Sequence, residues 1–170
     1  MDITKLVKDV DRFAYLWKRT ILSEIEFIKL VFTCEYSRYI TGELIYVSKM
    51  QFVSDEHAFV ALFKKIVFDN ELWNDNNANL TLEEWKNSLQ KFIIPNYIKL
   101  NDYRWLSANE FWDRFTYDMK GFGKGKDFVD YFKGFNKELK LHVVGEYSPS
   151  IEIFGVSEEI YFIYDYFAGD

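Results

Sequence analysis

The chain is poor in cysteine, proline and histidine. Its 170 residues include one cysteine, two prolines and two histidines. A single cysteine, Cys34, allows no internal disulfide and no cysteine-based zinc site, and we expect it to pack as a small apolar side chain. The lack of disulfides fits a reducing compartment, and the charged first residues leave no room for the apolar core of a signal peptide. We therefore expect a cytoplasmic protein that holds no metal and no other cofactor.

Long apolar runs are also missing. The uninterrupted apolar stretches have five or six residues at most, as in 160–164, whereas a membrane-spanning helix needs about 20. Apolar residues nevertheless make up 49% of the chain and aromatic residues 20%, which excludes the composition of a disordered protein. The length suits one domain. We predict a single globular domain over residues 1–170 that does not bind membranes.

Positive charge is absent from the C-terminal end. The net charge is −6, and the last thirty residues contain six Asp and Glu residues but no Lys or Arg. The first 140 residues are therefore neutral. A field of negative sign disfavours nucleic acid and favours a basic protein. We expect no direct nucleic-acid binding.

Apolar spacing and capping signals divide the chain into helices and strands. Two capping boxes, Thr81 with Glu84 and Ser107 with Glu110, mark helix starts. The predicted helices are residues 3–19, 54–72, 82–94, 108–119 and 126–139, and Pro95 is expected to end the third. The predicted strands are residues 28–36, 43–52, 141–144, 151–154 and 159–167. A helix is the alternative for the first of these segments, because Ser23 and Glu26 also form a capping pattern. The order predicts an α+β fold, a helix-rich single domain with a C-terminal antiparallel β-meander.

Two ligand-binding motifs fail at positions that their chemistry requires. The glycine-rich segment 120–126 is not a phosphate-binding loop, because Asp127 stands where Ser or Thr should follow the lysine. We expect a connector between helices there. The loop that begins at Asp75 has oxygen ligands at the first positions of a calcium-binding EF-hand loop. Lys86, however, occupies the position of the bidentate Glu, so calcium binding is not expected.

Catalysis would need residues brought together from distant segments. The two histidines, His57 and His142, are not spaced as a zinc-binding pair on a helix. We expect His57 at the surface of a first helical turn and His142 partly exposed in a strand. A histidine beside a carboxylate or Cys34 would give a small hydrolase or transferase. No local pattern favours such a site, so we predict that the protein is not an enzyme.

A group of aromatic residues in the middle of the chain could form a stacking platform for nucleic-acid bases. Such platforms are normally combined with a basic field, which this chain lacks. We therefore expect these residues in the core: Trp73, Trp85, Trp105, Phe111 and Trp112.

The strand predicted at residues 159–167 offers a candidate binding surface. The face with Ile160, Phe162, Tyr164 and Tyr166 is the expected core face. The opposite face alternates carboxylates with a tyrosine that we expect to be exposed. Tyrosine suits binding hot spots, and carboxylates steer association with a basic partner. The alternative is an edge strand whose acidic residues only prevent aggregation. The candidate partner-binding residues are Glu152, Glu158, Glu159, Tyr161 and Asp165.

Together these features predict an inhibitor that neutralises a basic protein, such as a toxin or nuclease, through its acidic and aromatic C-terminal surface. In general character the chain resembles the immunity proteins of bacterial toxin systems and the anti-defence proteins of phages, although no motif carries that likeness. Two alternatives are a small hydrolase or transferase with a site assembled from scattered carboxylates and a histidine, and an oligomeric scaffold subunit that pairs through its C-terminal strands.

Overall fold

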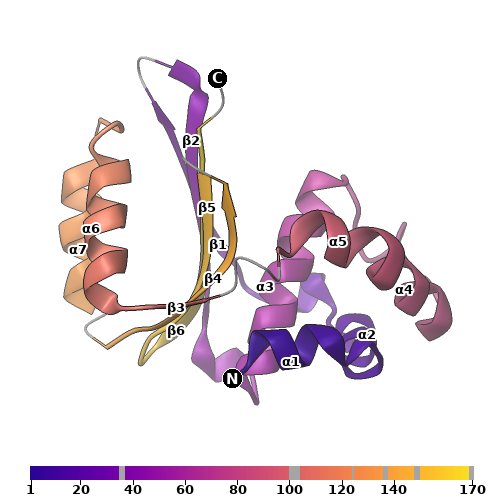
Figure 1. Ribbon diagram of the computed structural model, residues 1–170. Coiled ribbons are helices and arrows are strands. Elements are labelled where there is room, and N and C mark those ends of the chain that lie inside the picture. Colours follow the sequence, from indigo (N-terminus) through magenta and orange to yellow (C-terminus); the bar gives the residue numbers. More distant parts are fainter. Residues whose placement is uncertain (35–36, 100–103, 124, 136–137, 148–149, 169–170) are drawn as a thin grey trace.

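A six-stranded sheet lies between two helical layers (Figure 1). The computed structural model describes the chain except for residues 35–36, 100–103, 124, 136–137, 148–149 and 169–170. The helices are α1 (Ile3–Lys8), α2 (Val10–Arg19), α3 (Asp55–Asn70), α4 (Leu82–Ser88), α5 (Ile94–Tyr97), α6 (Ala108–Met119) and α7 (Gly125–Phe135). The strands are β1 (Ile28–Cys34), β2 (Ser37–Ser48), β3 (Arg104–Leu106), β4 (Lys140–Tyr147), β5 (Ser150–Val156) and β6 (Ile160–Ala168). The predicted α+β fold with its C-terminal meander is confirmed.

The strand order explains why the C-terminal strands are not at the edge of the sheet. All strands are antiparallel, in the order β1-β2-β6-β5-β4-β3. The meander β4-β5-β6 is extended on one side by β3 and on the other by the hairpin β1-β2. The alternative in which residues 159–167 form an edge strand is therefore wrong. The sheet order also disfavours pairing between two molecules through the C-terminal strands, because β5 and β6 each lie between two strands and β3 pairs with part of β4.

The first ambiguous segment is extended. Residues 28–48 form the hairpin of β1 and β2, and Ser23 lies in a short 3-10 turn, η1 (Leu22–Glu24), rather than at the start of a helix. Glu26 does not complete a cap, because its backbone N–H donates to the side chain of Gln51. The alternation of apolar and polar residues thus predicts this segment better than the capping pattern does.

Local capping signals set the helix starts, and two helices depart from their predicted extent. Both capping boxes form, at Thr81 and at Ser107. The helix predicted at residues 3–19 is divided at Asp9, whose side chain caps α2. Pro95 does not end its helix as predicted, since helical structure continues to Tyr97. A π-helical turn, η3 (Leu89–Ile93), comes directly before the proline, and such a turn accommodates a residue that has no N–H to donate.

Helices on each side bury one face of the sheet in its own apolar cluster. The first cluster joins α1 to α5 to the sheet and contains Trp85, and the second joins α6 and α7 to the sheet and contains Phe111 and Trp112. Trp73 packs half-buried against the first cluster. Trp105 was expected in the core, but it lies on β3 with 58% of its surface exposed, because β3 is the outer strand of the sheet. No described helix is long and apolar enough to cross a membrane.

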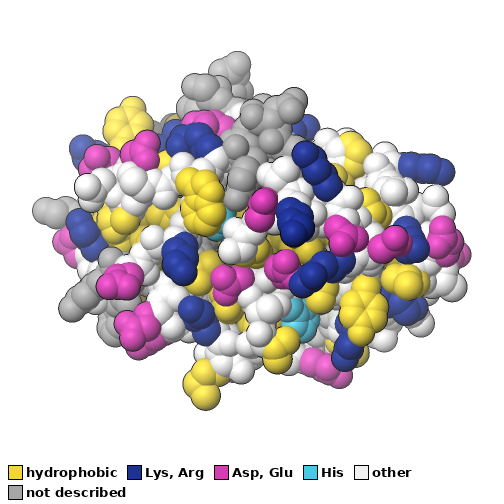
Figure 2. Space-filling model, turned by 60° about the horizontal axis from the view of Figure 1, so that its bottom comes forward, with side chains coloured by type: hydrophobic (Ala, Val, Ile, Leu, Met, Phe, Trp, Pro, Cys, Tyr) yellow, Lys and Arg dark blue, Asp and Glu magenta, His cyan; other side chains and the backbone are white. Residues whose placement is uncertain are grey.

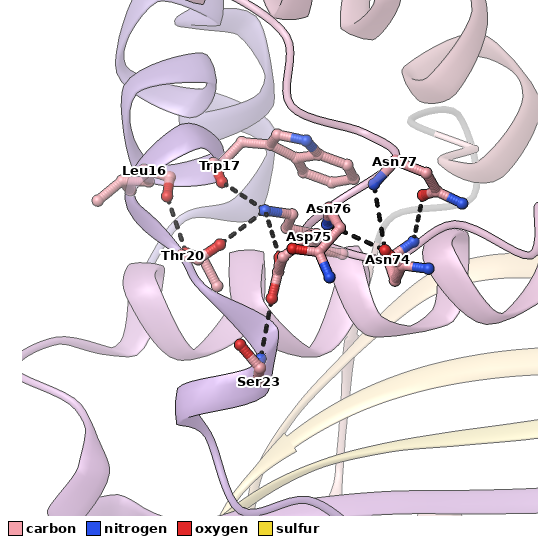
Figure 3. A network of polar contacts seen from close by, with 9 residues as sticks. Leu16, Trp17, Thr20, Ser23, Asn74, Asp75, Asn76 and Asn77 are labelled. Atoms are coloured by element: carbon pink, nitrogen blue, oxygen red, sulfur yellow. Dashed lines mark hydrogen bonds and ion pairs between the residues drawn. The ribbon is translucent and has the colours of Figure 1, made fainter.

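A buried lysine joins α3 to the end of α2 and to the loop that follows α3 (Figure 3). The ammonium of Lys64 donates to the carbonyl oxygens of Trp17 at 3.1 Å and Thr20 at 2.6 Å, and it lies 3.8 Å from Asp75. Asp75 also accepts a hydrogen bond from the backbone of Ser23. The carboxylate that resembled a calcium ligand in sequence is therefore used to hold the helical layer together.

Candidate partner-binding groove

The structure divides the five predicted partner-binding residues between two places. Glu152 on β5 and Asp165 on β6 are directly opposite each other, on the sheet face that carries α3. Glu158 and Glu159 lie in the turn between β5 and β6. Six residues of extended chain separate Glu159 from Asp165, roughly 20 Å. The predicted set therefore does not form one continuous surface.

Tyr161 belongs to the core and not to the surface. Only 4% of its surface is exposed, and its hydroxyl donates a hydrogen bond to Asp55 at 2.8 Å. Its ring lies against those of Phe52 and Phe154. The prediction of an exposed tyrosine is wrong, because α3 covers the face of β6 that we expected to meet solvent.

Acidic and basic residues both surround the turn between β5 and β6. A pocket beside it is lined by Glu158, Glu138 and Asp55, together with the basic residues Lys49 and Lys140. This end of the molecule comes forward in Figure 2, where basic and acidic side chains are interspersed. No field of one sign forms there among the described residues, so this end does not suit capture of a basic partner.

Three carboxylates form a row across the middle of the sheet. Glu43 on β2 is directly opposite Asp165 on β6, which is directly opposite Glu152 on β5. Directly opposed residues of an antiparallel pair project from the same face, with Cβ atoms about 5 Å apart. Gly145 on β4 ends the row, and Oε2 of Glu152 lies 3.6 Å from the position of a Cβ atom at that glycine. We call Glu43, Asp165 and Glu152 the carboxylate row.

Two members of the row, Asp165 and Glu152, line a groove between the sheet and the ends of α3 and α5. The groove has a volume of about 390 Å³. Asp165 is exposed at the groove, and Glu152 is half-buried in it. In Figure 1 the upper part of the sheet extends beyond α5 on this side. The helical residues of the groove come from the ends of α3 and α5, so the groove lies at the margin of the helical layer. The residues that line the groove are Ile66, Asn70, Asn96, Tyr97, Lys99, Gly145, Ile151, Glu152, Asp165 and Phe167.

One end of the row is neutralised by a basic residue. The ammonium of Lys29 on β1 lies 2.9 Å from Glu43 and 3.0 Å from Asp69 of α3. Asp69 also pairs with Lys65 at 2.5 Å. Within the described part of the chain, no basic group and no hydrogen-bond donor pairs with Asp165 or Glu152. The unbalanced charge of the row is therefore concentrated on these two carboxyls.

Loss of solvent and the charge of a neighbouring carboxylate make both unpaired carboxyls hard to ionise. Loss of solvent around the half-buried side chain, and then the charge of Asp165, raise the pKa of Glu152 to about 8. Partial loss of solvent, and then the charge of Glu43, raise the pKa of Asp165 to about 6, although part of this side chain still contacts water. At neutral pH the pair therefore carries fewer than two negative charges until a cation approaches. The described residues offer no cluster that could hold a metal ion.

His57 lies in a first helical turn, as predicted, whereas the prediction of a partly exposed His142 is wrong. His142 is buried against the ring of Trp105, and burial first, then the N-terminal amino group, lower its pKa to about 4. His57 lies in the first turn of α3, half-buried, and its Nε2 has no hydrogen-bond partner among the described residues. Cys34 packs against the apolar cluster beneath α6 and α7, as expected. The groove instead takes Ile66 and Asn70 from the far end of α3, so the histidines do not contribute to it.

Sequence reasoning missed Glu43, which completes the row. The alternation of Glu43, Ile45 and Val47 shows which side chains share a face of β2, but it does not show which strand lies beside β2. The comparisons add no relative: no known protein family, curated protein or solved structure matches the chain.

Proposed function

We propose that the protein is an inhibitor that binds a basic segment of a partner protein in the groove of the carboxylate row. The observation that carries this proposal is the direct opposition of Asp165 and Glu152 without a basic residue between them. Like charges directly opposite on neighbouring strands destabilise a sheet. The free protein limits that repulsion by keeping Glu152 protonated. A cationic side chain placed between the two carboxyls would favour loss of this proton and pair with both carboxylates.

The groove suits a lysine or arginine side chain of the partner. The carboxylates supply acceptors for an ammonium or guanidinium group, while Ile66 and Phe167 supply apolar surface for its aliphatic stem. Phe167 is exposed at the groove and offers an aromatic contact of the kind found in binding hot spots. Charge thus attracts the partner, and apolar contact holds it.

The mechanism of inhibition would be occlusion. Nucleases and many toxins use Lys and Arg to contact phosphate groups. A row of carboxylates with the spacing of neighbouring strands, about 4.8 Å, would occupy those side chains and keep the nucleic acid away. We place this complex in the cytoplasm, and we propose no catalytic role for the protein within it.

The test compares loss of two carboxyl groups from the row with loss of two carboxyl groups elsewhere. The double variant Glu152→Gln/Asp165→Asn removes the unpaired carboxyls without changing side-chain shape. The matched control, Glu158→Gln/Glu159→Gln, removes two carboxyls from the β5–β6 turn. The probe is a fluorescent ten-residue peptide that alternates Lys and Val, and fluorescence anisotropy measures its affinity at several salt concentrations.

We expect the row variant to weaken peptide binding by about tenfold, the effect of about 1.4 kcal/mol, and to reduce its salt dependence. The control should change affinity by less than about twofold, because exposed isolated charges contribute little. Equal losses in both variants would show that net charge alone attracts the peptide. That result, or failure of the natural chain to bind the peptide, would overturn the proposal.

A further inference from the structure

The outer strand β1 has the features of an edge that pairs with another strand. In the described part of the sheet it has a hydrogen-bonded neighbour on one side only, β2. It is seven residues long, whereas the opposite edge strand β3 has three. Its apolar side chains are open to solvent, with 42% of Ile28 and 56% of Val31 exposed. Long apolar edges invite strand pairing, and short or charged edges resist it.

The single charge of β1 does not protect this edge. A lysine that projects into solvent is a common device against edge pairing. Lys29, however, is held between Glu43 and Asp69, on the inner side of the strand. The free side of β1 therefore presents backbone groups and apolar side chains without an unpaired charge.

An apolar pocket borders the same edge on the face covered by α6 and α7. Val31, Phe32 and Thr33 form one wall, and Phe122, Phe128 and Tyr131 contribute to the other, around about 510 Å³. The ring of Phe32 lies 5.0 Å from that of Phe128. Side chains of an added strand would enter this space directly, because they would continue the sheet beneath α7.

We propose that β1 pairs with β1 of a second copy of this chain, antiparallel and around a two-fold axis perpendicular to the sheet. With such an axis, corresponding faces of the two sheets lie on the same side of the dimer. Odd-numbered residues of β1 then lie opposite odd-numbered residues of the second copy, and even-numbered residues opposite even-numbered ones. The register that pairs all seven residues places Val31 opposite Val31 of the second copy. It also places Leu30 opposite Phe32, so that apolar side chains meet on both faces.

The order of polar and apolar residues along β1 favours a second copy as the occupant. In this register Lys29, the one charged residue of β1, lies opposite Thr33 of the second copy and never opposite another lysine. In an antiparallel pair of two β1 strands, polar residues therefore lie opposite polar residues and apolar residues opposite apolar ones. The dimer is independent of the proposed function, since the groove lies on strands β6 and β5, away from the shared edge.

The position of Val31 on the two-fold axis gives a charge-pairing test. Analytical ultracentrifugation of the natural chain from about 1 to 300 µM should show a monomer–dimer equilibrium, with a dissociation constant on the order of 10 µM. Val31→Lys and Val31→Glu should each be monomeric, because like charges then meet on the axis. An equimolar mixture of the two variants should dimerise again.

Controls separate this effect from unfolding and from general charge. Val31→Lys is expected to fold, because its exposed side chain lies opposite Glu43, and circular dichroism verifies this for both variants. Val53→Lys adds the same charge at another exposed position and should leave dimerisation unchanged. A natural chain that stays monomeric to 300 µM overturns the proposal, as does a dimer that persists in both Val31 variants. A monomer would leave the edge open to a strand from a different protein.

Discussion

Replacing Glu152 with glutamine should make the protein more stable at alkaline pH and weaken its binding. Glutamine has nearly the same shape but cannot ionise. The ordinary pKa of glutamate is 4.5, and in the folded protein burial and then Asp165 raise the pKa of Glu152 to about 8. A difference of this size corresponds to about 5 kcal/mol for a group without solvent contact. Because Glu152 is half-buried and water screens part of the repulsion, we expect about 2 kcal/mol.

The sign of the effect follows from proton binding. Between pH 4.5 and 8 the folded chain holds the proton of Glu152 more often than the unfolded chain does. The favourable contribution is therefore fully present below pH 4.5 and is lost as the pH rises through 8. Glu152→Gln should match the natural protein near pH 4.5 and exceed its free energy of unfolding by about 2 kcal/mol near pH 9.

Urea denaturation at a series of pH values measures this difference. The control is Glu159→Gln, which removes a carboxylate from the exposed β5–β6 turn and should change stability by less than about 0.5 kcal/mol at every pH. A difference between Glu152→Gln and the natural protein that is constant with pH would refute the reasoning. So would a variant that is less stable at pH 9. A gain in stability together with a loss of peptide affinity is the pattern expected of a residue kept for binding.

Further predictions concern two packed positions. A Cβ atom at Gly155 would lie 2.0 Å from the ring of Phe162, which is fully buried, so Gly155→Ala should lower the free energy of unfolding by about 2–3 kcal/mol. The same substitution at Gly134, where nothing lies within 4 Å, should cost nothing in a urea titration, and equal effects would contradict the packing argument. Lys64→Met should lower the free energy of unfolding by about 2–3 kcal/mol in the same assay. The reason is that buried carbonyl oxygens at the end of α2, including that of Thr20, lose their hydrogen-bond donor. An unchanged urea midpoint would show that the lysine is not needed there.

Features of the fold that depend on neighbours in sequence were predictable. The caps at Thr81 and Ser107 depend on residues three positions apart, and the meander depends on short turns between successive strands. The extent of the helix at Pro95 was not predictable in this way. Its continuation depends on a π-helical turn, for which the sequence carries no comparably specific pattern.

The exposure of Tyr161 was predicted incorrectly because it depends on contacts between distant segments. The sequence placed it opposite a core face, as in a strand with one side in water. Residues 160–164 form an uninterrupted apolar run, however, and such runs are typical of strands buried on both faces. The run could have indicated a central strand. The pairing of β6 with β2, and therefore the contact of Asp165 with Glu43, joins segments more than a hundred residues apart and has no local signal.

The position of the carboxylate row within the sheet favours a role in binding over a role in stability. Where the helical layer covers this face, the sheet contributes apolar side chains such as Ile45 and Ile163. The row begins on the same strands just beyond that cover. Lys29 neutralises Glu43 at the outer end, which leaves Asp165 and Glu152 as an unbalanced pair in a groove. A stable sheet needs no such pair, because one basic residue at either position would have relieved the repulsion. Although Lys99 also lines the groove, neither carboxyl has a basic partner among the described residues, and a cationic side chain bound there would pair with both.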